Sequence, residues 1–168
     1  NVFMAKKRST TAPTSLKVLD FGIARVAAHA KTTATATMGS PAWMAPEQTD
    51  PRAPITPATD VWAIGLLSFW LLTGRPYWIA ANDRDASMHA LMREILFSPL
   101  VPASERADEL SVLHRLPPGF DAWFARCVHR EPSERYAAAD DLLDGFERVL
   151  AIAGITIPPP PISVPASM

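Results

Sequence analysis

Two short motifs contain the residues of this sequence whose types and spacing could do chemistry. Asp20-Phe21-Gly22 directly follows an apolar, strand-like run. Ala45-Pro46-Glu47, about 25 residues later, precedes a long apolar run that predicts a helix. A carboxylate at a strand end, with backbone freedom from the following glycine, suits the binding of a metal ion that neutralises charge in phosphoryl transfer. For the first motif taken alone, the alternative is an ordinary Asp-x-Gly turn.

The order and spacing of the two motifs are those of a protein-kinase activation segment. On these residues the chain resembles the C-terminal lobe of a bacterial, eukaryotic-like Ser/Thr protein kinase. Asn1 stands where that family's catalytic loop ends, so the resemblance implies that the catalytic Asp and the N-terminal lobe come before it. The expected fold class is mainly α: a kinase C-lobe with a short N-terminal β-hairpin, an activation loop and four or more helices, from a two-lobed α+β parent fold.

The resemblance implies residues for the binding of ATP and Mg²⁺. Asp20 matches the metal-binding Asp, Phe21 the residue that packs between the lobes, and Gly22 the source of backbone freedom. Asn1 is the expected second metal ligand, and an amide oxygen is a neutral, hard ligand suited to Mg²⁺. The alternative is that Asn1 is an unrelated first residue. Both cofactors are expected to need the N-terminal lobe.

Ser40 occupies a position at which the family usually carries Thr, and Trp43 stands in place of the usual Tyr. In the family this hydroxyl touches the catalytic Asp and helps to define the choice of acceptor. Asp20, Asn1 and Ser40 therefore form the expected catalytic set. The alternative for Ser40 is a plain turn before Pro41.

Three charged residues resemble structural anchors of the family. Glu47 and Arg135 match an ion pair that holds the activation segment to the helical core. Asp60 matches the Asp that holds the catalytic loop through backbone amides. The alternatives are solvated surface charges for the pair, and for Asp60 a carboxylate that only favours a helix start.

Residues 27–37 are small, polar or basic and show no apolar period, so they predict a mobile loop. In the family this loop carries the activating phosphorylation sites, and Thr32 and Thr33 are the favoured positions here. A phosphate would add close to two negative charges, which Arg25 could contact. The alternative is that these threonines are flexible filler.

The pattern of apolar residues predicts the elements that position these side chains. Residues 1–4 and 16–19 predict the two strands of a hairpin. Thr56-Pro57 is typical of a helix start and Gly74 of a stop, and the apolar run between them predicts a core helix buried on all sides. Helical spacing predicts three amphipathic helices after it, with apolar positions at Met88, Leu91, Met92, Ile95 and Leu96; Phe120, Trp123, Phe124 and Cys127; and Ala139, Leu142, Leu143, Phe146 and Leu150.

Composition limits the classes of partner. The net charge of −1 over 168 residues argues against nucleic acid, and the 12-residue apolar run 61–72 is short of the roughly 20 residues that span a membrane. Cys127 is the one cysteine, which excludes an internal disulfide and favours a reducing, cytoplasmic setting. The kinase domain is expected over 1–150 and a Pro-rich extended tail over 151–168, with a membrane anchor beyond the tail left open.

The expected function is ATP-dependent phosphoryl transfer to Ser or Thr of a protein substrate by the parent chain. This segment would supply metal ligands, the activation segment and the substrate-binding lobe, with its own N-lobe as a second partner. Residues 1–168 alone are expected to be inactive. The alternatives are a pseudokinase-type scaffold without catalysis and an unrelated helical binding module. An Asp five residues before Asn1, in a His-Arg-Asp context, would favour the enzyme.

Overall fold

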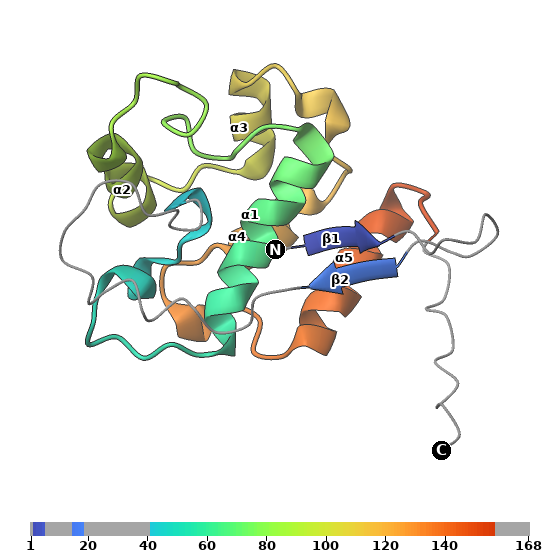
Figure 1. Cartoon of the computed structure of the whole chain (residues 1–168). Coiled ribbons are helices and arrows are strands. Elements are labelled where there is room, and N and C mark those ends of the chain that lie inside the picture. Colours follow the sequence, from blue (N-terminus) through green and yellow to red (C-terminus); the bar gives the residue numbers. More distant parts are fainter. Residues whose placement is uncertain (1, 6–14, 19–40, 157–168) are drawn as a thin grey trace. The chain divides into compact units, whose positions relative to one another are not determined.

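The computed structural model describes residues 2–5, 15–18 and 41–156 (Figure 1). The chain divides into two units, residues 1–38 and residues 39–168, and each is described by itself. The predicted mobile loop and residues 157–168 of the predicted Pro-rich tail lie outside the described residues.

The first unit contains a pair of antiparallel strands. β1 (Val2–Ala5) pairs with β2 (Ser15–Val18), so that Val2 lies opposite Val18 and Ala5 opposite Ser15. The predicted hairpin is confirmed, with strand bounds that differ by one residue from those expected. Its register brings the end of β2, two residues before Asp20 in the sequence, back beside the start of β1.

The second unit is built around α1 (Pro57–Thr73), shown in green in Figure 1. The helix begins after Thr56, whose backbone N–H donates to Oγ1 of Thr59 at 3.3 Å. It ends at Gly74, which has φ 73° and donates its N–H to the carbonyl of Trp70 at 2.7 Å. A left-handed backbone conformation at this position favours glycine, because glycine has no Cβ. Both predicted ends of the helix are confirmed.

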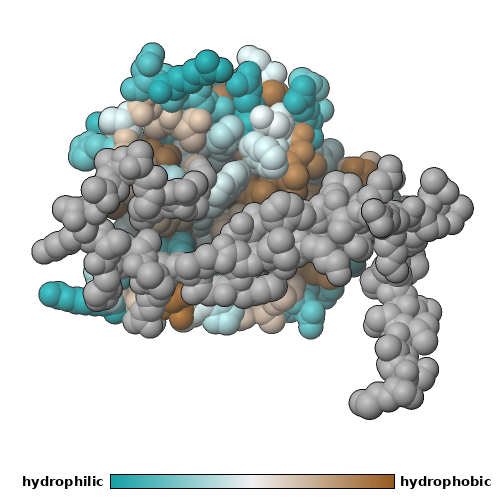
Figure 2. All heavy atoms as spheres, viewed as in Figure 1, coloured by the Kyte–Doolittle hydropathy of each residue, from teal (hydrophilic) through white to brown (hydrophobic). Residues whose placement is uncertain are grey.

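The prediction that α1 is buried on all sides is wrong. Trp62, Leu66 and Phe69 are buried, but Ile64 and Trp70 are each 40% exposed and Leu71 is 67% exposed. In the described part of the chain, α4 and three short 3₁₀ turns pack against α1, and they leave one face open. Figure 2 shows hydrophobic side chains reaching the surface of this unit between hydrophilic ones.

The three amphipathic helices are confirmed as α2 (Met88–Leu96), α4 (Phe120–Cys127) and α5 (Ala139–Ile152). A further helix, α3 (Ala103–Glu109), was not predicted. It has seven residues and buries only two alanines, Ala103 and Ala107, so it carries no stripe of large apolar side chains. Short 3₁₀ helices lie at η2 (Pro41–Trp43), η3 (Pro46–Thr49), η4 (Leu113–Arg115) and η5 (Pro132–Glu134).

The core lies where α1 meets α4 and the loop after α1. A Cβ built on Gly65 of α1 would lie 2.5 Å from the Cβ of Cys127 on α4, so the two helices approach too closely for any side chain at this position. Phe69, Tyr77 and Phe124 pack beside this contact, with ring centroids 4.9–5.8 Å apart. Burial raises the pKa of the Cys127 thiol well above its usual range, which fits an inert core residue.

Candidate functional site

A buried ion pair joins the end of the predicted activation segment to the helical core. Glu47 lies in η3 and Arg135 directly follows η5. Nη1 of Arg135 donates to Oε1 of Glu47 at 2.7 Å, and Nη2 donates to Oε2 at 2.9 Å. Glu47 is 8% exposed and Arg135 is 2% exposed. The two charges are therefore paired in parallel, by two charge-assisted hydrogen bonds, with little contact with water.

The remaining donors of Arg135 bind backbone carbonyls. Nε donates to the carbonyl of His129 at 2.6 Å, Nη1 also to that of Ala58 at 2.8 Å, and Nη2 also to that of Arg130 at 3.3 Å. The guanidinium carbon lies 5.1 Å from the ring centroid of Trp62. One side chain thus connects η3, the first turn of α1 and the loop between α4 and η5.

Thr59 is a third member of this cluster, and sequence reasoning missed it. Its Oγ1 donates to Oε1 of Glu47 at 2.8 Å, and Thr59 is 4% exposed. Burial by itself would raise the pKa of Glu47. Hydrogen bonds from Arg135, from the backbone and from Thr59, together with the charge of Arg135, outweigh burial and hold this pKa below its usual value. The carboxylate is therefore stabilised in its charged form.

Asp60 lies in the first turn of α1 and is exposed. Within the described residues its carboxylate has no hydrogen-bond or ion-pair partner. Asn1, at which the resemblance expects the catalytic loop to end, lies outside the described residues. The tethering role of Asp60 therefore stays a prediction.

The segment that follows Ser40 in the sequence is held by tryptophans. In η2, the carbonyl of Ala42 accepts a hydrogen bond from the indole Nε1 of Trp78 at 2.8 Å. The ring of Trp43 meets that of Trp70 edge to face, with centroids 6.2 Å apart. A buried indole N–H usually needs a hydrogen-bond acceptor, so a partner for Trp78 could be expected from the sequence. No pattern in the sequence identified Ala42 as that partner.

The residues predicted to bind the metal, the nucleotide or an activating phosphate lie outside the described residues: Asn1, Asp20, Phe21, Gly22, Thr32, Thr33 and Ser40. Over the described ranges, no group of three or more His, Cys, Asp or Glu side chains is placed to hold a metal ion. None of the helices in these ranges is both long and apolar enough to span a membrane.

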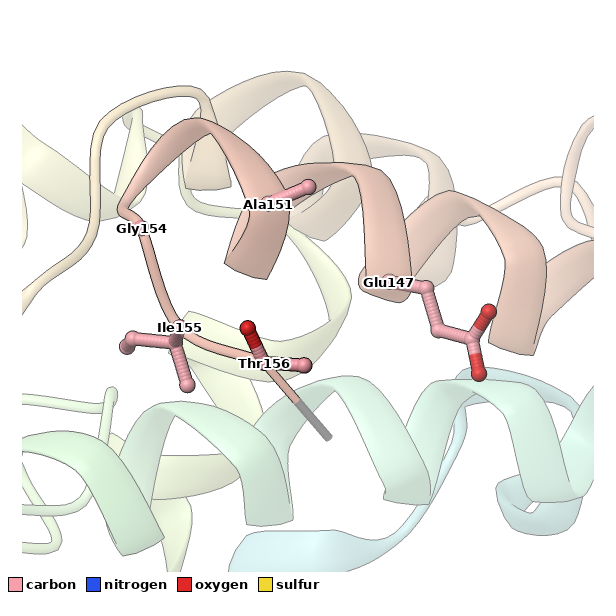
Figure 3. A pocket seen from close by; sticks show the side chains of 5 residues that line it. All are labelled: Glu147, Ala151, Gly154, Ile155 and Thr156. Atoms are coloured by element: carbon pink, nitrogen blue, oxygen red, sulfur yellow. The ribbon is translucent and has the colours of Figure 1, made fainter. Parts of the chain in front are cut away.

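A surface depression lies at the C-terminal end of α5 (Figure 3). It has a volume of about 390 Å³ and is lined by Glu147, Ala151, Gly154, Ile155 and Thr156. None of these five residues is buried, and none was predicted to do chemistry. No function is assigned to this depression, because it lacks a buried polar group that would orient a ligand.

Residues 1–145 match the protein kinase domain family. The chain belongs to this family. It is 30% identical over 149 residues to the Ser/Thr protein kinase PknK of Mycobacterium bovis, an alignment that covers 88% of this chain and 12% of the relative. It is 32% identical over 155 residues to Pkn1 of Myxococcus xanthus, covering 91% of this chain and 20% of the relative. For PknL of Mycobacterium tuberculosis the identity is 31% over 150 residues, covering 86% and 34%.

The chain spans 12% to 34% of the length of these three relatives. Its described elements, a strand pair followed by five helices, follow the order predicted for a mainly α kinase C-lobe. The family and the fold class that the sequence predicted are both confirmed. The activity of the whole protein is a separate matter.

Proposed function

We propose that the parent chain is a Ser/Thr protein kinase that uses ATP and Mg²⁺, and that this segment supplies its activation segment, part of its metal site and its substrate-binding lobe. The observation that carries the proposal is the buried pair of Glu47 and Arg135. A buried ion pair costs several kcal/mol of desolvation per ion, so it is weak evidence for stability alone. Here it fixes the last residue of the Ala-Pro-Glu motif to the core. An anchor at this residue is what the proposed activation segment, which starts at Asp20, requires.

Asn1 and Asp20 are the residues proposed to hold Mg²⁺. An amide oxygen and a carboxylate are both hard donors, which fits this cation. Bound there, Mg²⁺ would supply positive charge that offsets the negative charge of the ATP phosphates. Ser40 would orient the acceptor hydroxyl, and the acceptor is a Ser or Thr of a protein substrate. ATP as a substrate and a single buried thiol both favour the cytoplasm.

Phosphorylation of Thr32 or Thr33 is the proposed switch of the parent kinase. A phosphate brings three acceptor oxygens and close to two negative charges, which an arginine can bind in a bidentate manner. Arg25 is one candidate within this chain. Mass spectrometry after incubation with ATP and Mg²⁺, combined with the kinetics of a Thr32→Ala/Thr33→Ala variant, tests the switch. A fully active enzyme with neither residue phosphorylated would contradict it.

The decisive experiment measures phosphate transfer from radiolabelled ATP by the full-length parent protein and by its Asp20→Asn variant. The substitution removes the charge at the proposed metal site and conserves volume, so transfer should be abolished while the thermal unfolding midpoint is unchanged. Asp85→Asn, at an exposed position, is the matched control and should retain full activity. No transfer by the wild type would favour the pseudokinase-type scaffold. Unchanged transfer by Asp20→Asn would leave the kinase activity standing and contradict the role of Asp20 at the metal.

Residues 1–168 alone should not bind the nucleotide, because the N-lobe that covers the phosphates is absent from them. Calorimetric titration with millimolar ATP and Mg²⁺ should give no saturable heat. Micromolar binding by this segment would show that the N-lobe is not needed.

A further inference from the structure

A single buried hydrogen bond holds the segment that follows Ser40 to a residue 36 positions after Ala42. The indole Nε1 of Trp78 donates to the carbonyl of Ala42 at 2.8 Å. Trp78 is 2% exposed and Ala42 is 6% exposed. A buried carbonyl without its donor would carry the full cost of its desolvation, so this bond favours one placement of η2.

Trp78 is in turn fixed by α2. The backbone N–H groups of the next two residues, Ile79 and Ala80, donate to the two carboxylate oxygens of Glu94 at 2.8 and 2.9 Å. The indole ring stacks on Trp62 of α1, with centroids 6.1 Å apart and an angle of 24° between the planes. The loop that carries Trp78 is therefore held both by α2 and by α1.

The end of α2 is also secured. Arg130 donates to the carbonyls of Glu94, Ile95 and Ser98 at 3.0, 2.9 and 2.5 Å. These are carbonyls near the C-terminus of the helix, which lack partners within it. A continuous set of contacts thus runs from the loop after α4, through α2 and Trp78, to the backbone of η2.

We propose that Trp78 is a positioning residue for η2, and that Glu94 acts through Trp78 to place the backbone that follows Ser40. This inference rests on the proposed function in one respect: η2 is taken as part of the substrate-facing segment of a protein kinase. Neither residue need touch the substrate. Loss of the indole donor should release Ala42, and with it the turn closed by the N–H of Met44 on the carbonyl of Pro41 at 3.1 Å.

The chain offers a matched control in Trp123. Its indole Nε1 donates to a backbone carbonyl, that of Leu142, at 2.9 Å, and the residue is 3% exposed. Trp78→Phe and Trp123→Phe therefore each remove one buried hydrogen bond from an indole to a backbone carbonyl, and the same side-chain volume. Trp123 joins α4 to α5, so its loss should not change the placement of η2.

Amide hydrogen exchange of the full-length protein, followed by mass spectrometry of peptides that cover residues 41–47, tests the proposal without any need for activity. Trp78→Phe should speed exchange in these peptides by about tenfold, as expected for loss of about 1.4 kcal/mol. Trp123→Phe should leave them at the wild-type rate and speed exchange in α4 and α5 instead. Equal rates at 41–47 in the two variants would overturn the proposal.

Glu94→Gln keeps the test decisive if Trp78→Phe does not fold. A carboxamide retains one oxygen acceptor, so one of the two N–H groups at Ile79 and Ala80 loses its partner. Exchange at 41–47 should then rise by a smaller factor, about threefold, since Glu94 acts on η2 only indirectly, through the backbone next to Trp78. A wild-type rate at 41–47 in Glu94→Gln would overturn the role of Glu94.

Steady-state kinetics of the parent kinase separate positioning from simple destabilisation. Trp78→Phe should raise the KM for the protein substrate by about threefold to tenfold and leave the KM for ATP unchanged, whereas Trp123→Phe should change neither. If the wild type transfers no phosphate, the proposed function fails, and hydrogen exchange still tests whether Trp78 positions η2. If the wild type is active and the two variants share the same KM values and exchange rates, the inference about Trp78 fails alone.

Discussion

The described part of the chain contains two ion pairs with the same closest separation and very different surroundings. Arg135 and Glu47 lie 2.7 Å apart, with side chains 0% and 6% exposed, and come from segments 88 residues apart. Arg106 and Glu109 also lie 2.7 Å apart, but they are three residues apart on α3, and the side chain of Glu109 is 47% exposed. The distance between charges does not distinguish the two pairs, whereas burial and sequence separation do.

The two ion pairs also differ in the number of hydrogen bonds that support them. Glu47 accepts two bonds from Arg135 and one from Thr59, and Arg135 also binds three backbone carbonyls. Glu109 accepts one bond, from Nη1 of Arg106. An exposed pair is screened by water and salt, while removing one partner of a buried pair leaves an uncompensated charge. Breaking the buried pair should therefore destabilise this unit far more than breaking the exposed one.

Arg135→Ala should give the largest effect, a loss of about 3–5 kcal/mol in the free energy of unfolding, because it leaves the carboxylate of Glu47 buried without its partner. Urea denaturation followed by far-UV circular dichroism measures this loss. Arg93→Ala, at an exposed position of α2, is the control and should change stability by less than about 0.5 kcal/mol. A loss under about 1 kcal/mol for Arg135→Ala would mean that the pair is no anchor.

Glu47→Gln should cost about 1.5–3 kcal/mol at pH 7, the usual contribution of hydrogen bonds to a charged group. The folded-state pKa of Glu47 lies below its reference value of 4.5, so its ionised form stabilises the fold above that pH. This contribution is lost as the pH falls through the folded pKa. The stability difference between wild type and Glu47→Gln should therefore shrink as the pH is lowered below about 4.5. A difference that stays constant from pH 7 to pH 3 would contradict the charged pairing.

Thr59→Val should cost about 1–2 kcal/mol, because valine keeps the shape of threonine but removes both the donor to Glu47 and the acceptor for the N–H of Thr56. Thr59→Ser should retain most of the stability, since the hydroxyl remains. Thr49→Val tests a hydroxyl that is exposed and donates to the carbonyl of Pro46, and it should cost less than about 0.5 kcal/mol. Equal losses for Thr59→Val and Thr49→Val would show that Thr59 does not support the pair.

The sequence predicts well what local chemistry determines. Both ends of α1 follow from Thr56-Pro57 and Gly74, because capping and left-handed turns depend on a few adjacent residues. The strand pair and three amphipathic helices follow from apolar periodicity. The seven-residue α3 could not be predicted in this way, because its buried residues are two alanines and form no apolar stripe.

Tertiary features were harder to predict, for identifiable reasons. Apolar residues all round α1 suggested complete burial, but the number of elements that pack on a helix is not encoded in its own sequence. The partners Glu47 and Arg135 could be suggested only from a family resemblance, since no local pattern links residues 88 positions apart. Thr59, Trp78 and Glu94 were missed because their importance lies in contacts with other elements. The predicted catalytic set, Asn1, Asp20 and Ser40, lies outside the described residues.

The smallest effect is expected for Glu109→Ala, which breaks the pair on α3. An exposed ion pair contributes about 0–1 kcal/mol, and alanine also raises the helix propensity of this position slightly. The net loss in urea denaturation should therefore stay below about 0.5 kcal/mol, and it should vanish in 1 M salt, where the screening length falls to about 3 Å. The loss caused by Arg135→Ala should persist in the same salt, because water and ions do not reach that pair. If salt reduced both losses by the same fraction, burial would not be what separates the two pairs.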